Sequence, residues 1–450
     1  MKKQSKRTRK RNVPYIPVTE AQRKEMLARI GVPSLETLFS EIPGDLRFPP
    51  LDLEGGLSEL EVMAEINALA KTNAAVDDYR WFLGAGAYNH FIPSAVGALA
   101  SRGEFLTAYT PYQSEVSQGT LQAIFEYQSM IAALTGMEVV NAGHYDGATA
   151  LAEGVLLALR NNGGRRVLIP RGLHPEYREV LETYLSPFET RLETYSGDPA
   201  GAAEGEGLAC LVAAYPDFFG RVPSLEGAAQ AVHDRGGLLI VHADPIMLGL
   251  FRSPGSYAAD IVTAEGQSLG NDLNYGGPFL GIMAVSAALM RRIPGRIVGE
   301  ARDPQGRRGF VLTLAAREQH IRREKALSNI CSNQGLCALR AGIYLSLMGK
   351  QGLRNVAELC WHKSHYAAGL FSSLQGFSVA PGLFFKEFTL TLPGNAEEAA
   401  ENLLKKNIVP GLPLSRYFPE REKELLVCIT EKNTREDIHT LVDALKELYL

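Results

Sequence analysis

Lysine is missing from a long central part of the 450-residue sequence, since none occurs between Lys71 and Lys325. The gap is not a general shortage of basic side chains, because arginine occurs throughout the same span, for example at Arg291, Arg296 and Arg308. A side chain needs a primary amine to form an imine with an aldehyde. No residue of this span can therefore form a Schiff base.

Cysteine and long apolar runs are also scarce. The five cysteines are Cys210, Cys331, Cys337, Cys360 and Cys428, and none lies in a C-x-x-C pair of the kind used for zinc or dithiol chemistry. We interpret them as reduced, mostly buried thiols of a cytoplasmic protein. No apolar run reaches the roughly 20 residues that span a bilayer. The basic start, MKKQSKRTRKRN, is followed by polar residues instead of an apolar core, so we expect no secretion and no membrane partner.

Several other functional classes lack their sequence signatures. The net charge of -4 and the pI near 6.2 argue against a nucleic-acid binder, which usually carries a basic domain. The glycines of FLGAGAYNHF do not complete the dinucleotide motif G-x-G-x-x-G, and no G-x-S-x-G elbow of a serine hydrolase is present. No His, Cys and carboxylate spacing resembles a metal site. Small molecules and proteins remain as the expected partners.

The composition is that of a large folded protein, with 46% hydrophobic and 21% charged residues. We predict a basic tail over residues 1–15, a helical arm over 16–60, a large domain over 61–325 and a smaller α/β domain over 326–450. In the arm, Thr19 and Gln22 form a capping-box pattern, and SLETLFSEI predicts a second short helix. The arm cannot bury its apolar face alone, so we expect it to pack on the body or on another subunit.

Alternating helices and apolar strands follow the arm and predict an α/β fold with a mostly parallel sheet covered on both faces. In LLIVHADPIMLG, Asp244 stands at the carboxyl end of a strand, the edge where such sheets bind ligands. In pyridoxal-phosphate enzymes an aspartate there pairs with the protonated pyridine nitrogen. The alternative is an aspartate that only caps the next turn.

The Schiff-base lysine of such an enzyme normally follows the aspartate by a few tens of residues. Here that segment is DIVTAEGQSLGNDLNYGG, which offers Gln267, Ser268 and Asn271, and none of these forms an imine. The chain therefore cannot run pyridoxal chemistry alone, and Asp244 is left without its partner.

NAGHYDGATALAEG contains only part of a phosphate-binding motif. Thr149 lies in the first turn of a predicted helix, whose N-terminal amides bind anions in many proteins. Asp146 would repel a phosphate there, so we favour Asp146 as the N-cap of the helix over a phosphate site.

The segment EFLTAYTPYQSEVSQG crowds aromatic and polar groups around a proline just before a strongly apolar helix. Loops of this content are often functional sites, while the alternative is an interface loop whose tyrosines pack between subunits. The candidate residues are Tyr109, Thr110, Pro111, Tyr112 and Gln113, to which His90 of the preceding loop is added.

The stretch from EFLTAYTPYQ to ALAEG resembles the signature of the P-protein of the glycine cleavage system, and in particular subunit 1, the N-terminal half of its two-chain bacterial form. YIPVTEAQRKEMLARIGV, FLGAGAYNHFIPSAV, GQSLG and GRRGFVLTLAAREQHIRREKALSNICSNQ are further matches. The resemblance therefore covers nearly the whole chain after the basic tail.

This resemblance implies a pyridoxal-phosphate-dependent transferase fold of type I, the aspartate-aminotransferase type, and a heterotetramer with two copies each of subunit 1 and subunit 2. Subunit 2 carries the Schiff-base lysine and thus the covalently bound pyridoxal phosphate. The family's enzyme is a glycine dehydrogenase (aminomethyl-transferring), an oxidoreductase that decarboxylates glycine and passes the aminomethyl group to the lipoyl arm of H-protein.

Carried over to this sequence, the resemblance places Tyr109, Thr110, Pro111, Tyr112 and Gln113 at a shared active-site mouth. Asp244, Thr149, Gln267 and Ser268 become relic cofactor positions. Relatives can carry two adjacent histidines where this chain has Asn89 and His90, which leaves the role of the first one open. A non-catalytic scaffolding or regulatory subunit, and an independent aminotransferase or decarboxylase, remain the alternatives.

Overall fold

The structure is a computed structural model that describes residues 17–47, 49–50, 55–326, 328, 330 and 334–449. The predicted basic tail and Cys331 lie outside the described residues. The chain divides into two compact units, residues 1–74 and residues 75–450. The predicted limits of the arm and of the two domains stay predictions.

The first unit contains two capped helices. In α1 (Glu20–Ile30) the Thr19 side chain accepts a hydrogen bond from the backbone of Gln22, which confirms the predicted capping box. Helix α2 (Glu59–Ala70) begins with a second capping box. Between them, the described residues form the 3-10 turns η1 (Glu36–Phe39) and η2 (Gly44–Leu46) and no further helix. The predicted helix SLETLFSEI is therefore a single turn, because no side chain caps its start.

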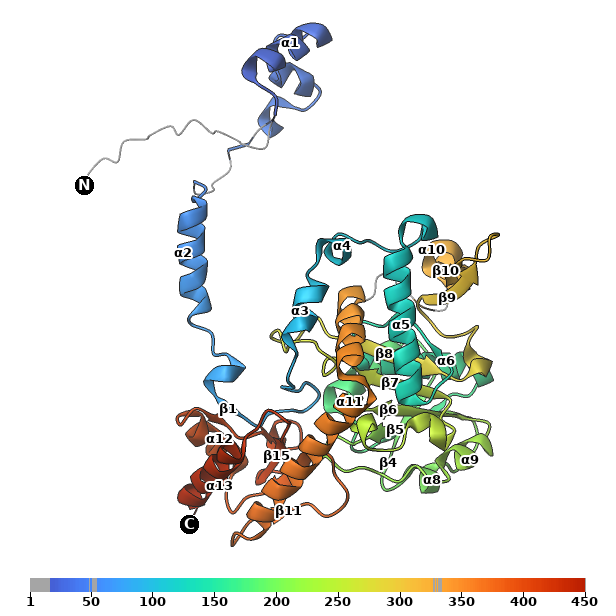
Figure 1. Ribbon diagram of the computed structural model, residues 1–450, viewed down its shortest axis with the longest axis vertical. Coiled ribbons are helices and arrows are strands. Elements are labelled where there is room, and N and C mark those ends of the chain that lie inside the picture. The colour runs from blue at the N-terminus through green and yellow to red at the C-terminus, as the bar shows by residue number, and fades with distance from the viewer. Residues whose placement is uncertain are drawn as a thin grey trace, which may run out of the picture. The chain divides into compact units, whose positions relative to one another are not determined.

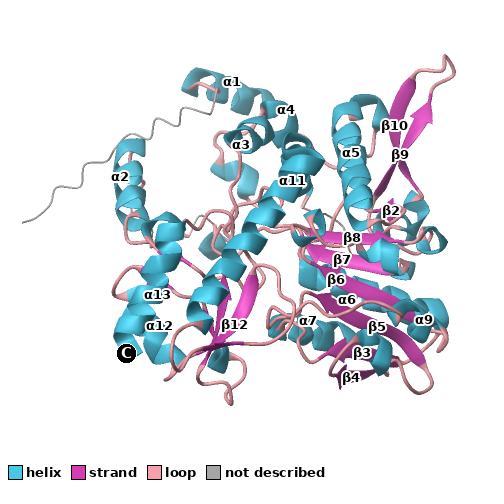
Figure 2. Ribbon diagram, turned by 60° about the horizontal axis from the view of Figure 1, so that its bottom comes forward, coloured by secondary structure: helices cyan, strands magenta, loops and turns pink. Residues whose placement is uncertain are grey.

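The second unit is built on a seven-stranded sheet with the order β2-β8-β7-β6-β5-β3-β4 (Figures 1 and 2). The pairs from β7 across to β4 are parallel, and β8 and β2 add an antiparallel edge. The strands are β2 (Val139–Val140), β3 (Arg166–Pro170), β4 (Arg191–Tyr195), β5 (Leu208–Tyr215), β6 (Leu238–Ala243), β7 (Ile261–Glu265) and β8 (Gly281–Val285).

Helices cover both faces of this sheet. Alternate residues of β5 face opposite ways, so that Val212 packs into a core with helix α6 (Gly147–Asn162) and helix α7 (Pro175–Leu185). Leu211 belongs to the other core, which includes residues of α5 (Gln118–Thr135), α9 (Ala228–His233) and α11 (Gly335–Ser372). Helices α5 and α11 lie side by side (Figure 1). The predicted α/β class with a mostly parallel sheet is confirmed.

Two helix limits depend on glycines. The pattern of SLEGAAQAVHDRG predicts a helix that opens at Ser224, but α9 begins at Ala228, because Gly227 has φ +73°, which a right-handed helix does not allow. In α11, Gly349 has φ +58° and separates two helical halves. The sequence pattern predicts two helices here, QGLCALRAGIYLSLMG and VAELCWHKSHYAAGLFSSL, and the two halves match them.

A smaller antiparallel sheet, of order β11-β12-β15-β14, lies near the C-terminus. Its strands are β11 (Ser378–Val379), β12 (Glu387–Thr391), β15 (Glu424–Cys428) and β14 (Leu412–Pro413), and helices α12 (Ala396–Leu404) and α13 (Arg435–Tyr449) share its core. A separate two-stranded sheet forms where β1 (Arg80–Trp81), near the start of the second unit, pairs with β13 (Ile408–Val409). Phe82 thereby joins the same core.

Short elements complete the second unit. The loop from residue 101 to residue 117 joins α3 (Ser94–Ala100) to α5 and contains α4 (Gly103–Leu106) and the 3-10 turn η4 (Ser114–Val116). Strands β9 (Ile297–Arg302) and β10 (Arg308–Thr313) form a hairpin. The remaining helices are α8 (Pro199–Ala202) and α10 (Gln319–Arg322).

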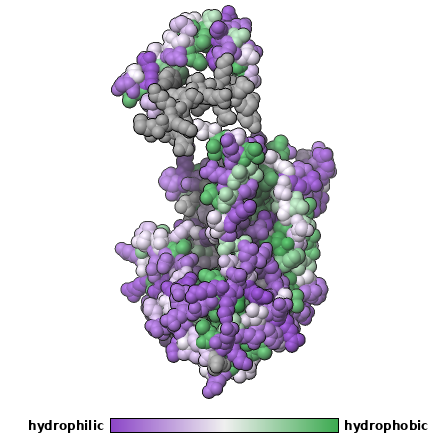
Figure 3. All heavy atoms as spheres, turned by 90° about the vertical axis from the view of Figure 1, so that its left-hand side faces the viewer, coloured by the Kyte–Doolittle hydropathy of each residue, from purple (hydrophilic) through white to green (hydrophobic). Residues whose placement is uncertain are grey.

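On the face shown in Figure 3, hydrophilic side chains predominate and smaller hydrophobic patches lie between them. Among the described residues, no helix combines the length and the hydropathy needed to cross a bilayer.

The N-cap of α12, a helix that packs on the small sheet, can be tested by its contribution to stability. Asn395 accepts hydrogen bonds from the amides of Glu397 and Glu398. We expect Asn395→Ala to lower the free energy of unfolding by about 1 kcal/mol, and Asn395→Asp to restore most of the loss. Urea unfolding of the three proteins measures this, and equal midpoints would contradict the cap.

Candidate functional site

The candidate site begins at Asp244, which follows β6 at the carboxyl edge of the sheet. One carboxylate oxygen, Oδ1, accepts hydrogen bonds from the amides of Ile246 at 2.9 Å and Met247 at 3.3 Å. This is the predicted capping of the next turn. The other oxygen, Oδ2, lies 2.7 Å from the ammonium nitrogen of Lys386. Asp244, which the sequence left without a partner, is therefore paired.

Lys386 directly precedes β12 of the small sheet, and its side chain is 1% exposed. Its Nζ lies 3.0 Å from Nε2 of His90 and 3.4 Å from the ring centre of Tyr88. Burial alone would lower the pKa of Lys386, but the Asp244 carboxylate more than offsets this, so that the pKa is raised. The ammonium therefore keeps its proton and is no nucleophile.

His90 links Lys386 to a second carboxylate. Its Nδ1 lies 2.7 Å from Glu431, which also accepts the backbone N–H of Phe91. Because the Lys386 ammonium can only donate, Nε2 of His90 accepts and Nδ1 carries the proton that is donated to Glu431. Burial raises the pKa of Glu431, but His90 and the Phe91 amide hold it at about 2.

His90, Cys360 and Glu431 bring three possible metal-ligand atoms within 4.8 Å of one another. The site already contains a positive charge, because the Lys386 ammonium contacts the second nitrogen of His90. A divalent ion at this point would be repelled by that ammonium. We interpret the group as a buried hydrogen-bond network.

Glu387, the neighbour of Lys386, binds the same N-terminal loop. Its two oxygens accept the backbone N–H of Ala85 at 2.6 Å and the hydroxyl of Tyr88 at 2.8 Å. A side chain at Gly84 would place its Cβ 2.4 Å from Glu387 Oε1, so only glycine permits this approach. Together, Lys386, Glu387 and Glu431 fix the loop from residue 84 to residue 91, which we call the clamp loop.

The N-terminus of α6 is closed by two carboxylates. Asp146 accepts the N–H of Thr149 at 2.7 Å, which confirms Asp146 as the N-cap. Glu265, at the end of β7, accepts the N–H of Gly147 at 2.8 Å. Burial raises the pKa of Glu265 to about 7, although Gly147, Leu280 and Gln267 donate amide hydrogen bonds to it.

The other predicted relic residues hold the protein's own backbone. The Thr149 hydroxyl completes the capping box with the Asp146 backbone. Gln267 exchanges hydrogen bonds with the backbone of Tyr88 and donates to Asn271. Ser268 is buried, and its hydroxyl has no hydrogen-bond partner among the described residues.

The residues between Asp244 and α6 enclose a cavity of about 70 Å³. Its walls include His174, Tyr177 and His242, whose rings contact one another at centroid distances of 4.9 and 5.1 Å. Ligand pockets usually measure about 300–1,000 Å³. The space left at this edge of the sheet is therefore small.

Pyridoxal phosphate does not fit these residues. Asp244, the aspartate predicted for the ring nitrogen, already binds an ammonium, and the N-terminus of α6, the position predicted for the phosphate, is capped by two carboxylates. Gln267 stands in the segment where the Schiff-base lysine was expected, and its amide is engaged by the clamp loop.

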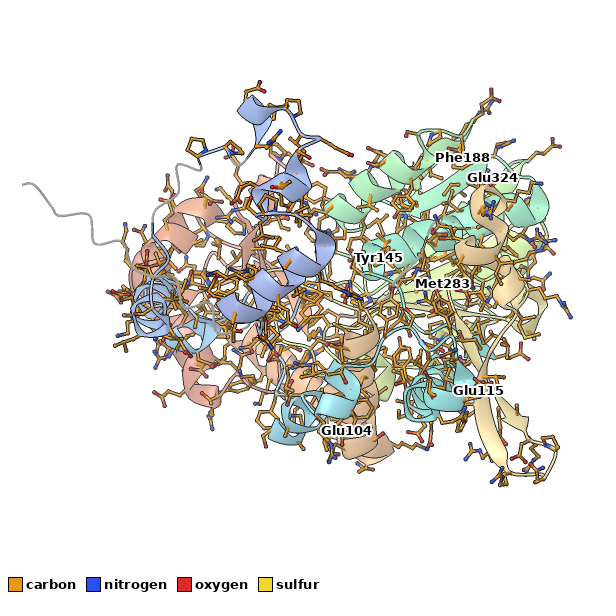
Figure 4. All side chains as sticks on the ribbon, turned by 90° about the horizontal axis from the view of Figure 1, so that it is seen from above. Glu104, Glu115, Tyr145, Phe188, Met283 and Glu324 are labelled. Carbon is orange, nitrogen blue, oxygen red and sulfur yellow. The ribbon has the colours of Figure 1, made fainter. Side chains whose placement is uncertain are left out.

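The predicted loop of residues 109–113 lies elsewhere, at the surface beside α5. Tyr109 is 83% exposed. Together with Thr110, Pro111 and residues of α5 and α11, it lines a cavity of about 370 Å³. Gln113 is exposed and precedes η4. Figure 4 shows Glu115 of η4 beside the β9–β10 hairpin.

Tyr112 turns to a neighbouring cavity of about 390 Å³ that is rich in charged groups. Its hydroxyl accepts a hydrogen bond from Arg296 at 3.2 Å, and its ring lies 5.0 Å from that of His320. Arg296 borders both cavities and is only 6% exposed. His90 lines neither cavity and belongs to the network around Lys386.

Comparison with solved structures identifies the fold. Sphingosine-1-phosphate lyase from Burkholderia pseudomallei matches with a TM-score of 0.63 at 14% identity, over 90% of this chain and 94% of that one. Mouse CSAD matches with a TM-score of 0.66 over 92% of each chain, also at 14% identity. Likenesses this distant show the fold alone. The fold is that of the pyridoxal-phosphate-dependent enzymes of type I, as predicted.

Two further comparisons identify the family within this fold. A model of the family "Glycine cleavage system P-protein" matches residues 13–445, and the chain belongs to this family. A crystal structure of glycine decarboxylase (P-protein) of the glycine cleavage system, in inhibitor-bound form, matches with a TM-score of 0.89 at 45% identity, over 96% of this chain and 99% of that one.

Curated relatives carry matching names. "Probable glycine dehydrogenase (decarboxylating) subunit 1" of Desulforamulus reducens is 50% identical over 436 residues, 95% of this chain and 98% of the relative. The protein of the same name from Thermomicrobium roseum is 49% identical over 443 residues, 96% of this chain and 99% of the relative.

The raised pKa of Glu265 makes stability depend on pH. A glutamate in the unfolded chain titrates near ~4.3, and Glu265 in the folded protein near about 7. Between these values the folded state binds more protons than the unfolded chain, so the Glu265 contribution to stability falls as pH rises. We expect Glu265→Gln to remove up to about 1.4 kcal/mol per pH unit of that slope.

Urea unfolding between pH 4.5 and pH 7.5 measures the slope for both proteins. Glu189→Gln, which changes an exposed carboxyl, is the matched control and should leave the slope unchanged. Parallel curves for wild type and Glu265→Gln would show that Glu265 titrates normally.

Proposed function

We propose that this chain is subunit 1 of a glycine-decarboxylating P-protein and that it acts only together with a subunit 2. The complex decarboxylates glycine and transfers the aminomethyl group to the oxidised lipoyl arm of H-protein. The observation that carries the proposal is the match over nearly the whole length of relatives named subunit 1 of this enzyme.

The state of the pocket supports a division of labour between two chains. No lysine occurs between Lys71 and Lys325, and the described lysine beside Asp244 is held as an ammonium. When bound, pyridoxal phosphate supplies an electron sink for the carbanion formed on an amino acid. We therefore assign the cofactor and its Schiff-base lysine to subunit 2.

The contribution of this chain is best supported at the loop of residues 109–113. Tyr109 exposes its hydroxyl and ring, and Pro111 is buried and anchors the loop. A phenol held in this way can orient a substrate group and keep water away once a second chain covers the cavity. We place this loop at the mouth of the active site of subunit 2.

The first unit supports assembly with a partner. Helix α2 leaves Val62, Met63, Ile66 and Leu69 exposed, and their spacing of one, four and seven residues from Val62 places them on one helical face. An exposed apolar face of this kind marks a protein contact. We expect the heterotetramer to hold two copies each of the two subunits, in the cytoplasm.

Co-expression with a subunit 2 tests the function directly. The complex should exchange the glycine carboxyl carbon with labelled bicarbonate when lipoylated H-protein is present, and each subunit alone should not. Exchange by this chain alone would support an independent decarboxylase. No exchange by an intact complex would reject the proposed function.

Tyr109 and Gln113 distinguish a contributing subunit from a scaffold. We expect Tyr109→Phe or Gln113→Ala to lower the exchange rate of the complex about tenfold or more, because the substrate loses a hydrogen-bond partner worth ~1.5–3 kcal/mol when charged. Glu115→Gln in the same loop is the control and should retain full activity. Size-exclusion chromatography checks that assembly is intact. Unchanged rates in both variants would favour the scaffold.

A further inference from the structure

Asp244 stands at the carboxyl end of β6, where we predict the aspartate that meets the ring nitrogen of the cofactor in type I enzymes. The group it meets there must be a cation. Lys386 meets this need, because its ammonium forms an ion pair with Oδ2 of Asp244 at 2.7 Å and is buried. The positive charge that a pyridinium would bring is therefore supplied by the chain.

At the opposite end of the pocket, side chains of the protein also stand in for a charged group of the cofactor. The amides at the start of α6, which bind phosphate in many proteins, donate instead to Asp146 and Glu265. An anion supplied by the chain thus stands where a phosphate would stand. Each charged end of the cofactor has a side-chain counterpart of the same sign.

We propose that Lys386 is a built-in substitute for the pyridinium of the cofactor, and that its ion pair with Asp244 holds the small sheet closed against the large one over the clamp loop. The proposal depends on the fold and the contacts and not on the proposed activity. In this proposal, the pocket is occupied by a side chain of the protein itself, Lys386.

The contacts around the ion pair explain why closure depends on it. Asp244 belongs to the large sheet, Lys386 precedes β12 of the small sheet, and His90 and Tyr88 belong to the clamp loop between them. Without the ammonium, a carboxylate that is 5% exposed faces no positive charge in this network. An unpaired buried charge strongly destabilises a folded protein.

Chemical rescue of the full-length chain tests the substitution. Lys386→Ala removes three carbons and the ammonium, the size of n-propylammonium. We expect Lys386→Ala to melt at a lower temperature than wild type, and n-propylammonium chloride to raise its Tm in a saturable way, as a ligand of the folded state does. Tetramethylammonium chloride and sodium chloride at equal concentration should not.

Wild type and Lys350→Ala are the matched controls for this experiment. Lys350 is exposed, so neither protein offers an empty ammonium site and neither should respond to propylammonium beyond the response to sodium chloride. A Tm of Lys386→Ala equal to wild type, or an equal response to all three salts, would overturn the proposal.

If Lys386→Ala does not fold, a double variant without either charge tests the proposal instead. Lys386→Met with Asp244→Asn removes both charges and retains volume, so we expect the double variant to melt above both single variants. A double variant that melts at or below Lys386→Met would overturn the proposal. None of these readouts uses enzymatic activity, so a failure here is distinct from a failure of the proposed function.

Discussion

The buried ion pair between Lys386 and Asp244 is the constraint on which the rest of the site depends. It joins the two sheets, and through His90 and Tyr88 it fixes the clamp loop. A buried pair is not in itself a large source of stability, because desolvation offsets much of the Coulomb attraction. Its effect is specific, since either charge alone would be left buried and unpaired.

The position of the clamp loop connects this buried network with the surface. The chain passes from the clamp loop through α3 and α4 into residues 109–113. Fixing residues 84–91 therefore fixes the start of the segment that carries Tyr109. A pocket whose residues do not fit the cofactor still has a use, because it holds the clamp loop, from which the chain leads to the loop that we assign to the neighbouring active site.

Much of the fold was predictable because it depends on local patterns. The apolar runs that became β5 and β6, the cap at Asp146 and the place of Asp244 at a strand end all follow from short stretches of sequence. The predicted helix start at Ser224 was wrong, because Gly227 has a positive φ and α9 begins only at Ala228. The loop of residues 109–113 was found from its content alone, and its role stays a prediction.

The partner of Asp244 was not predictable in the same way. Lys386 lies far along the chain from Asp244, directly before a strand of the small sheet, and outside the segment in which a Schiff-base lysine is expected. The signal that was present is the stretch FFKEF, in which a lysine and a glutamate interrupt an apolar run before a strand. Glu265 and Glu431 were missed for the same reason, since their roles arise from contacts distant in sequence.

Borohydride reduction of the complex with pyridoxal phosphate, followed by peptide mapping of both chains, tests the central claim most directly. The claim is that this chain fills its own cofactor site with Lys386. A phosphopyridoxyl group on a lysine of the partner subunit, and none on Lys386, is the predicted result. A phosphopyridoxyl group on Lys386 would contradict it.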